Sequence, residues 1–251
     1  MATGQKKPAA RADNQVLTAD EFFDRLSALC DSGINNEKHY RSDDPQNVCM
    51  GVRMGNIFAL AKEFTAMPLA EVSKLLDNKY YEARMGAMSI MDFKARDKKT
   101  TDAERKQLYN LYIKKHDKIT NWDMVDRSAP YVVGGYLYDK PRDVLYKLAK
   151  SKNEWERRTA IVSTYFFIRK CDVNDTFEIG ELMVHDKQES VNKAVGSWVR
   201  EAGKKDRKQL LGFLDRYAAT MPRITLRYAL EKQDKKTKEH YMNAYKVNTK
   251  K

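Results

Sequence analysis

One recurring motif constrains the fold of this chain more than any other feature of the sequence. A basic residue is followed two positions later by a small one, and the basic residues of the four copies are Arg84, Arg158, Lys193 and Arg227. They are separated by 74, 35 and 34 residues, and 74 is twice 37. The third copy is the loosest, because its second residue is Val195. A repeat of this length, with two helices per unit, is typical of an α-solenoid.

The low content of turn-forming residues also favours helices. The 251 residues include 11 glycines and 6 prolines, where average usage would give roughly 18 and 13. So few turn formers argue against a sandwich or barrel of many short strands. Apolar residues instead follow helical spacing, as at Ile57, Leu60, Ala61 and Phe64, and we find no convincing strand alternation. We therefore predict an all-α protein.

Local signals set the expected helix boundaries. Thr18 with Glu21, and Thr101 with Glu104, have the spacing of capping boxes at helix starts. Pro68 suits the first turn of a helix that ends near Leu76. Further helices are expected at 80–95, 130–138, 141–150, 153–170, 176–186, 189–202, 206–219 and 222–232.

The chain divides into three parts by composition. Residues 1–15 are rich in Lys, Ala and Gly, and we expect a disordered basic tail. Residues 16–232 form the predicted helical-repeat domain. Residues 233–251 are Lys-rich and are predicted to form a C-terminal helix or tail.

The charge balance suggests the class of partner. Lys and Arg number 47 against 35 Asp and Glu, which gives a formal charge of +12. A surface this basic suits a polyanion, either nucleic acid or an anionic membrane face. Mean hydropathy is −0.73, and the apolar stretches are far shorter than the roughly 18 residues of a membrane span. We therefore expect no membrane insertion.

Cofactor and catalytic motifs are largely missing from the sequence. The three cysteines are scattered without metal or disulfide spacing, which fits a reducing cytoplasm. The N-terminus has no apolar signal-peptide region. There is no GxxxxGK[ST], GxGxxG or HExxH motif and no hydrolase triad. We expect a cytoplasmic protein, associated with the nucleoid if bacterial, with no metal and no cofactor, and nothing requires more than a monomer.

The densest chemical signal is the pair Trp122 and Asp126. The two residues are four apart, so on a helix their side chains are neighbours. An indole face attracts a cation, and a carboxylate stabilises positive charge, so the pair suits a planar cationic ligand. The alternative is that Trp122 belongs to the core and Asp126 is solvated.

Two further clusters combine aromatic and basic residues. In the first, Trp155 precedes the adjacent arginines Arg157 and Arg158. Neighbouring residues lie about 100° apart on a helix, so one arginine can face a groove while the other pairs with a nearby glutamate. The alternative is a surface ion-pair network. In the second, Lys193 and Trp198 flank Gly196, which allows a close backbone approach; Trp198 is a core residue or a ligand contact.

Together these clusters resemble the AlkD-like DNA glycosylases of the DNA alkylation repair family. The resemblance covers about residues 45–232 and rests on short motifs whose order and spacing are jointly specific. It implies HEAT-like helical repeats with a basic concave face curved around duplex DNA. It also implies excision of purines alkylated at N3 or N7. The motifs are Gly51–Gly55, Tyr81–Arg84, Trp122–Asp126, Trp155–Ile161, Lys193–Gly196, Arg200–Gly203 and Met221–Glu231.

The resemblance also implies roles for individual residues. The family's catalytic Asp falls on Asp126, a lesion-contacting Trp on Trp122, and a DNA-contacting Arg on Arg158. The family's second active-site Trp falls on Ser197, and the Trp of this chain follows one residue later at Trp198. The residues expected to bind DNA are Arg84, Arg157, Arg158, Lys193, Arg200, Arg223 and Arg227.

The implied chemistry follows from the charge of the lesion. Alkylation at N3 or N7 leaves a cationic purine whose departure creates an oxocarbenium-like sugar, which a fixed carboxylate stabilises. Two other hypotheses stay open at this stage. One is a DNA-binding solenoid that cannot excise bases, because Ser197 stands where the family has its second active-site Trp. The other is a protein-interaction scaffold, the commonest use of helical repeats.

Overall fold

The computed structural model describes residues 16–31, 33–34 and 47–248, with the side chains of 245–248 excluded. The predicted tail at residues 1–15 lies outside this range. The described residues form helices and no strand; a single isolated bridge joins Val48 to Tyr80. The prediction of an all-α fold is therefore confirmed.

The helices follow one another with short connections. In chain order they are α1 (Ala19–Ser27), α3 (Met54–Glu63), α4 (Leu69–Leu76), α5 (Tyr81–Arg96), α6 (Asp102–Lys114), η1 (His116–Lys118), α7 (Trp122–Ala129), η2 (Pro130–Gly134), α8 (Gly135–Leu137), α9 (Asp143–Leu148), α10 (Glu154–Ser163), α11 (Tyr165–Arg169), α12 (Asn174–Leu182), α13 (Glu189–Gly203), α14 (Arg207–Tyr217), α15 (Arg223–Leu230) and α16 (Lys235–Asn248).

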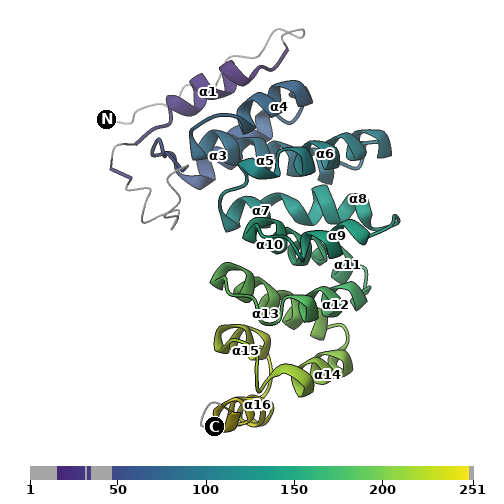
Figure 1. Cartoon of the computed structure of the whole chain (residues 1–251). Helices are drawn as coiled ribbons and strands as arrows, with labels where there is room; N and C mark the ends of the chain where they lie inside the picture. The colour runs from purple at the N-terminus through teal and green to yellow at the C-terminus, as the bar shows by residue number, and fades with distance from the viewer. Residues whose placement is uncertain (1–15, 32, 35–46, 249–251) are drawn as a thin grey trace.

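The helices stack in two rows, which is the arrangement of an α-solenoid (Figure 1). In the first row α5, α7, α10, α13 and α15 each pack against the next. The second row contains α6, α8, α9, α12 and α14. One continuous apolar core runs between the rows from Leu17 to Tyr241. A first-row helix therefore has one face in the core and another free to form a surface.

Several predicted boundaries agree with the structure. Thr101 and Glu104 form a complete capping box at the start of α6. Thr18 Oγ1 accepts a hydrogen bond of 3.2 Å from the backbone N–H of Glu21. The helix that follows Pro68 ends at Leu76, as the sequence predicted.

Two helices that were predicted to be continuous are interrupted or distorted in the structure. The segment 153–170 is divided at Thr164 into α10 and α11, and the segment 130–138 contains the π-helical turn η2. Both distortions occur where the two segments meet. Pro130 has no N–H to continue the α-helical ladder. A Cβ at Gly134 would lie 2.1 Å from the carbonyl oxygen of Ser163, so the backbones approach very closely there.

The helix starts also correct the register of the recurring motif. Arg158, Lys193 and Arg227 are the fifth residues of α10, α13 and α15. Asp126 is the fifth residue of α7, whereas Arg84 is the fourth of α5 and corresponds to Arg157 of α10. The basic row therefore contains three of the four predicted members, and Asp126 occupies the same helical position as they do.

Candidate active site in a groove of the solenoid

A groove of about 740 Å³ lies along the first row of helices. It is formed mainly by α7, α10 and α13, with single contributions from α11 and α15. All three tryptophans of the chain, Trp122, Trp155 and Trp198, line it. The predicted site residues that the structure brings together here are Trp122, Asp126, Arg158, Lys193, Ser197, Trp198 and Arg200.

The Asp126 carboxylate is held by a bidentate contact with Arg158. Arg158 Nε donates to Asp126 Oδ1 at 3.0 Å, and Nη2 donates to Oδ2 at 2.7 Å. Arg158 Nη1 also donates to the backbone carbonyl of Ser190. The Arg158 side chain is 8% exposed, whereas Asp126 keeps 31% of its side chain exposed at the groove. The arginine therefore holds the carboxylate in one orientation and leaves part of it accessible.

Trp122 forms the open wall of the site beside Asp126. It is 43% exposed, which excludes the alternative that it belongs to the core. Asn121 caps α7, since its side chain accepts a hydrogen bond from the backbone N–H of Trp122. The Arg158 guanidinium lies 5.9 Å from the centroid of the Trp122 ring. An indole, a carboxylate and a guanidinium thus meet at one point of the groove.

Ser197 and Trp198 both line the groove, on adjacent positions of α13. The Trp198 ring packs at a tilt on Tyr165, with 5.0 Å between the centroids. Its Nε1 is buried and has no hydrogen-bond partner among the described residues. Both side chains therefore line the groove, and the Trp198 indole also packs on Tyr165 of α11, which is itself part of the groove wall.

Gly196 lets α15 approach α13 closely enough to reach the groove. A Cβ at this position would lie 2.5 Å from the carbonyl oxygen of Thr225 and 2.6 Å from Tyr228 Cβ. A larger residue would push the two helices apart. The predicted close approach at Gly196 is therefore observed, and it places Tyr228 in the groove wall.

The basic residues on α13 are paired with acids, and those on α15 are exposed. Lys193 Nζ lies 2.5 Å from Glu189. Arg200 contacts Glu201, with Nε at 3.1 Å, and also Glu231. Arg223 and Arg227 are exposed on α15, beside the groove but outside its lining.

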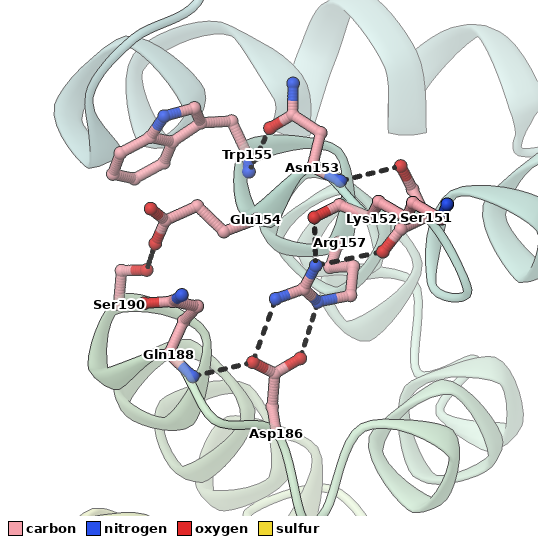
Figure 2. A network of polar contacts seen from close by, with 9 residues as sticks. All are labelled: Ser151, Lys152, Asn153, Glu154, Trp155, Arg157, Asp186, Gln188 and Ser190. Atoms are coloured by element: carbon pink, nitrogen blue, oxygen red, sulfur yellow. Dashed lines mark hydrogen bonds and ion pairs between the residues drawn. The ribbon is translucent and has the colours of Figure 1, made fainter.

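Arg84 and Arg157 are not in the groove, which argues against the predicted DNA contacts. Arg157 Nη1 donates to the carbonyls of Ser151 and Lys152, at 2.9 and 3.0 Å. Its other nitrogens form a double contact with Asp186, at 2.5 and 3.0 Å (Figure 2). Asp186 in turn accepts from the backbone N–H of Gln188 at 2.8 Å. Arg157 therefore joins the loop before α10 to the loop before α13.

Arg84 repeats this arrangement in an earlier repeat. Its Nη1 donates to the carbonyls of Asn78 and Lys79, both at 3.1 Å, which are six and five residues earlier, as in Arg157. Its Nη2 donates to the side chains of Asn47 and Thr120, at 2.6 and 3.1 Å. Arg84 is 5% exposed. Both arginines connect loops of neighbouring repeats, and we call them the loop arginines.

Asp123 is a second carboxyl group near the site, and no sequence signal singled it out. Tyr81 of α5 donates its hydroxyl proton to Asp123 Oδ2, and the backbone N–H of Met124 donates to Oδ1 at 2.9 Å. Burial raises the pKa of Asp123 to about 6, and these hydrogen bonds oppose the rise. Asp123 therefore ties α7 to α5.

Tyr165, Tyr228 and Glu201 also line the groove and were not predicted. Tyr165 lies seven residues after Arg158, which is two helical turns along the same face, so this spacing was a usable signal. Among the described residues, no group of three or more His, Cys, Asp or Glu side chains could hold a metal ion. The described helices include none long and apolar enough to span a membrane.

The fold and groove define a helical-repeat protein whose open surface combines basic and aromatic side chains, with a fixed carboxylate among them. The sequence model for "DNA alkylation repair enzyme" matches residues 25–233, so the chain belongs to this family. The family implies DNA as the partner. No curated protein matches the chain. A structure described as "Predicted DNA alkylation repair enzyme from Enterococcus faecalis" shares the fold, with a TM-score of 0.58, 16% identity, and coverage of 88% of this chain and 99% of that one.

Proposed function

We propose that the protein is a DNA glycosylase that hydrolyses the N-glycosidic bond of cationic, N3- or N7-alkylated purines in duplex DNA. The observation that carries the proposal is the Asp126 carboxylate, held by Arg158 and lying beside the exposed indole of Trp122. Asp126 keeps 31% of its side chain exposed at the groove, and in this proposal it faces the positive charge of the lesion.

The reaction needs stabilisation of positive charge more than it needs an acid. The alkylated purine is already a good leaving group, so its bond to C1′ breaks with the electron pair passing to the base. The base leaves as a neutral molecule and the sugar becomes oxocarbenium-like. A water oxygen then bonds to C1′ and gives a proton to Asp126 or to solvent. The carboxylate stabilises the sugar cation and orients this water.

Arg158 acts in this proposal as a positioning residue for Asp126. Its planar guanidinium matches the two carboxylate oxygens, which a lysine ammonium cannot do. Its contacts with Asp126 and with the Ser190 carbonyl occupy the guanidinium. We therefore assign phosphate binding to Lys193, Arg200, Arg223 and Arg227 instead.

Lys193 on α13 is suited to exchange its acidic partner for a phosphate. The Lys193–Glu189 contact is exposed, with 40% and 69% of the side chains accessible, and exposed ion pairs contribute little stability. A DNA phosphate can replace the glutamate at low cost. Binding should therefore weaken steeply as salt is raised. A flat salt dependence would contradict a groove that binds phosphates.

A second candidate, a DNA-binding protein without excision, is favoured by the Ser197 and Trp198 arrangement. At the position where the family has its second active-site Trp this chain has Ser197, and the Trp198 indole that follows packs on Tyr165. One experiment separates the candidates: incubation with methylated and unmodified duplex DNA, with chromatography of the released bases. The proposal predicts release of 7-methylguanine or 3-methyladenine. The second candidate predicts tight binding with no released base.

A further inference from the structure

The last helix, α16, lies beyond the part of the chain that the family model matches, which ends at residue 233. It packs on α15, at the end of the row that forms the groove (Figure 1). Neighbouring packed helices are separated by about 8–10 Å. A polyanion bound beside α15 is therefore within reach of α16.

The structure fixes the position of α16 through both of its neighbours. Tyr241 is buried, and its hydroxyl donates to Asp215 of α14 at 2.7 Å. Asp234 caps the helix, because its Oδ1 accepts from the backbone N–H of Thr237 at 2.9 Å. Arg207 lies 3.6 Å from the same aspartate. The start of α16 is thus a defined surface of the solenoid.

The segment is the most basic part of the chain. Residues 232–251 contain seven lysines and two acids, which gives +5 of the total +12. Both acids already have a role or a partner: Asp234 caps the helix, and Glu239 lies 3.9 Å from Lys235. Lys236 and Lys238 have no ion-pair partner within 4.0 Å among the described residues.

We propose that α16 is an additional contact surface for the phosphate backbone of duplex DNA, through Lys235, Lys236 and Lys238. The proposal rests on the proposed function only in taking DNA as the polyanion. In this proposal the exposed arginines of α15, Arg223 and Arg227, and the lysines of the adjacent helix α16 contact successive phosphates of the same duplex. This surface contributes to affinity and to its salt dependence, and it takes no part in bond cleavage.

The test compares two triple variants that remove equal charge. In K235Q/K236Q/K238Q the lysines of α16 are neutralised, and glutamine keeps the helical propensity. In K98Q/K99Q/K106Q three exposed lysines of the α5–α6 turn and of α6, in the other row, are neutralised. Binding of an end-labelled, unmodified duplex of about 30 base pairs is measured at several salt concentrations. Circular dichroism confirms that both variants remain helical.

We expect the α16 variant to lose about tenfold in affinity, and its plot of log K against log salt to be shallower by up to about 3. The α6 variant should stay within about twofold of wild type, and K235R/K236R/K238R should bind like wild type. Equal losses in both Gln variants, or none in either, would overturn the inference while the proposed function stands. Absence of duplex binding by the wild type would overturn both.

Discussion

The protein contains two pairs of identical residues, Arg157 with Arg158 and Asp123 with Asp126. The members of each pair lie close in sequence but have different surroundings. Arg157 joins two loops behind the groove, whereas Arg158 holds Asp126 inside it. Asp123 accepts a hydrogen bond from Tyr81 of α5, whereas Asp126 is partly open to the groove. In each pair one residue connects neighbouring repeats and the other belongs to the candidate site.

The difference arises from position on the helix. Adjacent residues are about 100° apart, and residues three apart are still offset by about 60°. One residue of a pair therefore points toward a loop or a neighbouring helix, and the other points into the groove. Residue type and composition cannot distinguish them, because each pair is chemically identical. The comparison predicts separate effects on stability and on excision, and these can be measured.

The largest expected effect is on stability. Arg157→Leu leaves Asp186, which is 7% exposed, without its cationic partner, and two loop carbonyls without a donor. Breaking a buried pair in this way costs about 3–5 kcal/mol. Urea denaturation should therefore show a clearly lower midpoint. If the variant is as stable as the wild type and instead loses DNA affinity, Arg157 belongs with the groove residues.

Asp123 should give a characteristic pH dependence of stability. The pKa of this carboxyl is raised from 3.8 to about 6 in the folded protein, so the folded state binds the proton more tightly than the unfolded state does. The resulting stabilisation is complete below about pH 4 and is lost as the pH rises through 6, by up to about 3 kcal/mol. Asp123→Asn cannot ionise and should lack this loss. Parallel stability curves for the two proteins from pH 4 to 7 would contradict the assignment.

Arg158→Lys should separate positioning from phosphate binding. The lysine keeps the charge but cannot contact both carboxylate oxygens, so Asp126 loses its fixed orientation. Single-turnover base release should fall about 10- to 100-fold, while affinity for unmodified duplex changes by less than about twofold. Unchanged release together with a flatter salt dependence of binding would identify Arg158 as a phosphate contact instead.

The smallest effect is expected at the exposed end of the basic row. Arg227→Gln should weaken duplex binding by a few fold and lower the slope of log K against log salt by about 0.9, for one phosphate contact. Arg84→Gln is the matched control, because this loop arginine is buried. Equal changes of slope in the two variants would remove the distinction between the loop arginines and the exposed arginines of α15.

Much of the fold could be predicted from the sequence because its causes are local. Capping residues such as Thr101 and the spacing of apolar residues fix helix starts and core faces without knowledge of distant contacts. The break at Thr164 and the π-turn at Pro130 depend on a close approach between two helices at Gly134 and Ser163. Pro130 is a local signal of a disturbed helical ladder, but no local pattern shows which distant backbone approaches it.

The candidate site was predictable where one helix carries the signal. Trp122 and Asp126 are neighbours on α7, and their proximity needed only helical geometry. The pairing of Asp126 with Arg158, and of Tyr165 with Trp198, joins different helices. The register of the repeats determines these contacts. The motif found in the sequence aligned Arg84 with Arg158, but Arg84 lies one helical position earlier and corresponds to Arg157.

The most direct test of the account is single-turnover release of 7-methylguanine from methylated duplex DNA by Asp126→Asn and its matched control, Asp123→Asn. Both variants replace a carboxylate of α7 by an amide of the same shape. We expect Asp126→Asn to release base about 10²- to 10³-fold more slowly while duplex affinity is retained. Asp123→Asn should stay within a few fold of the wild type. Full activity of Asp126→Asn would remove this carboxylate from the mechanism and contradict the account.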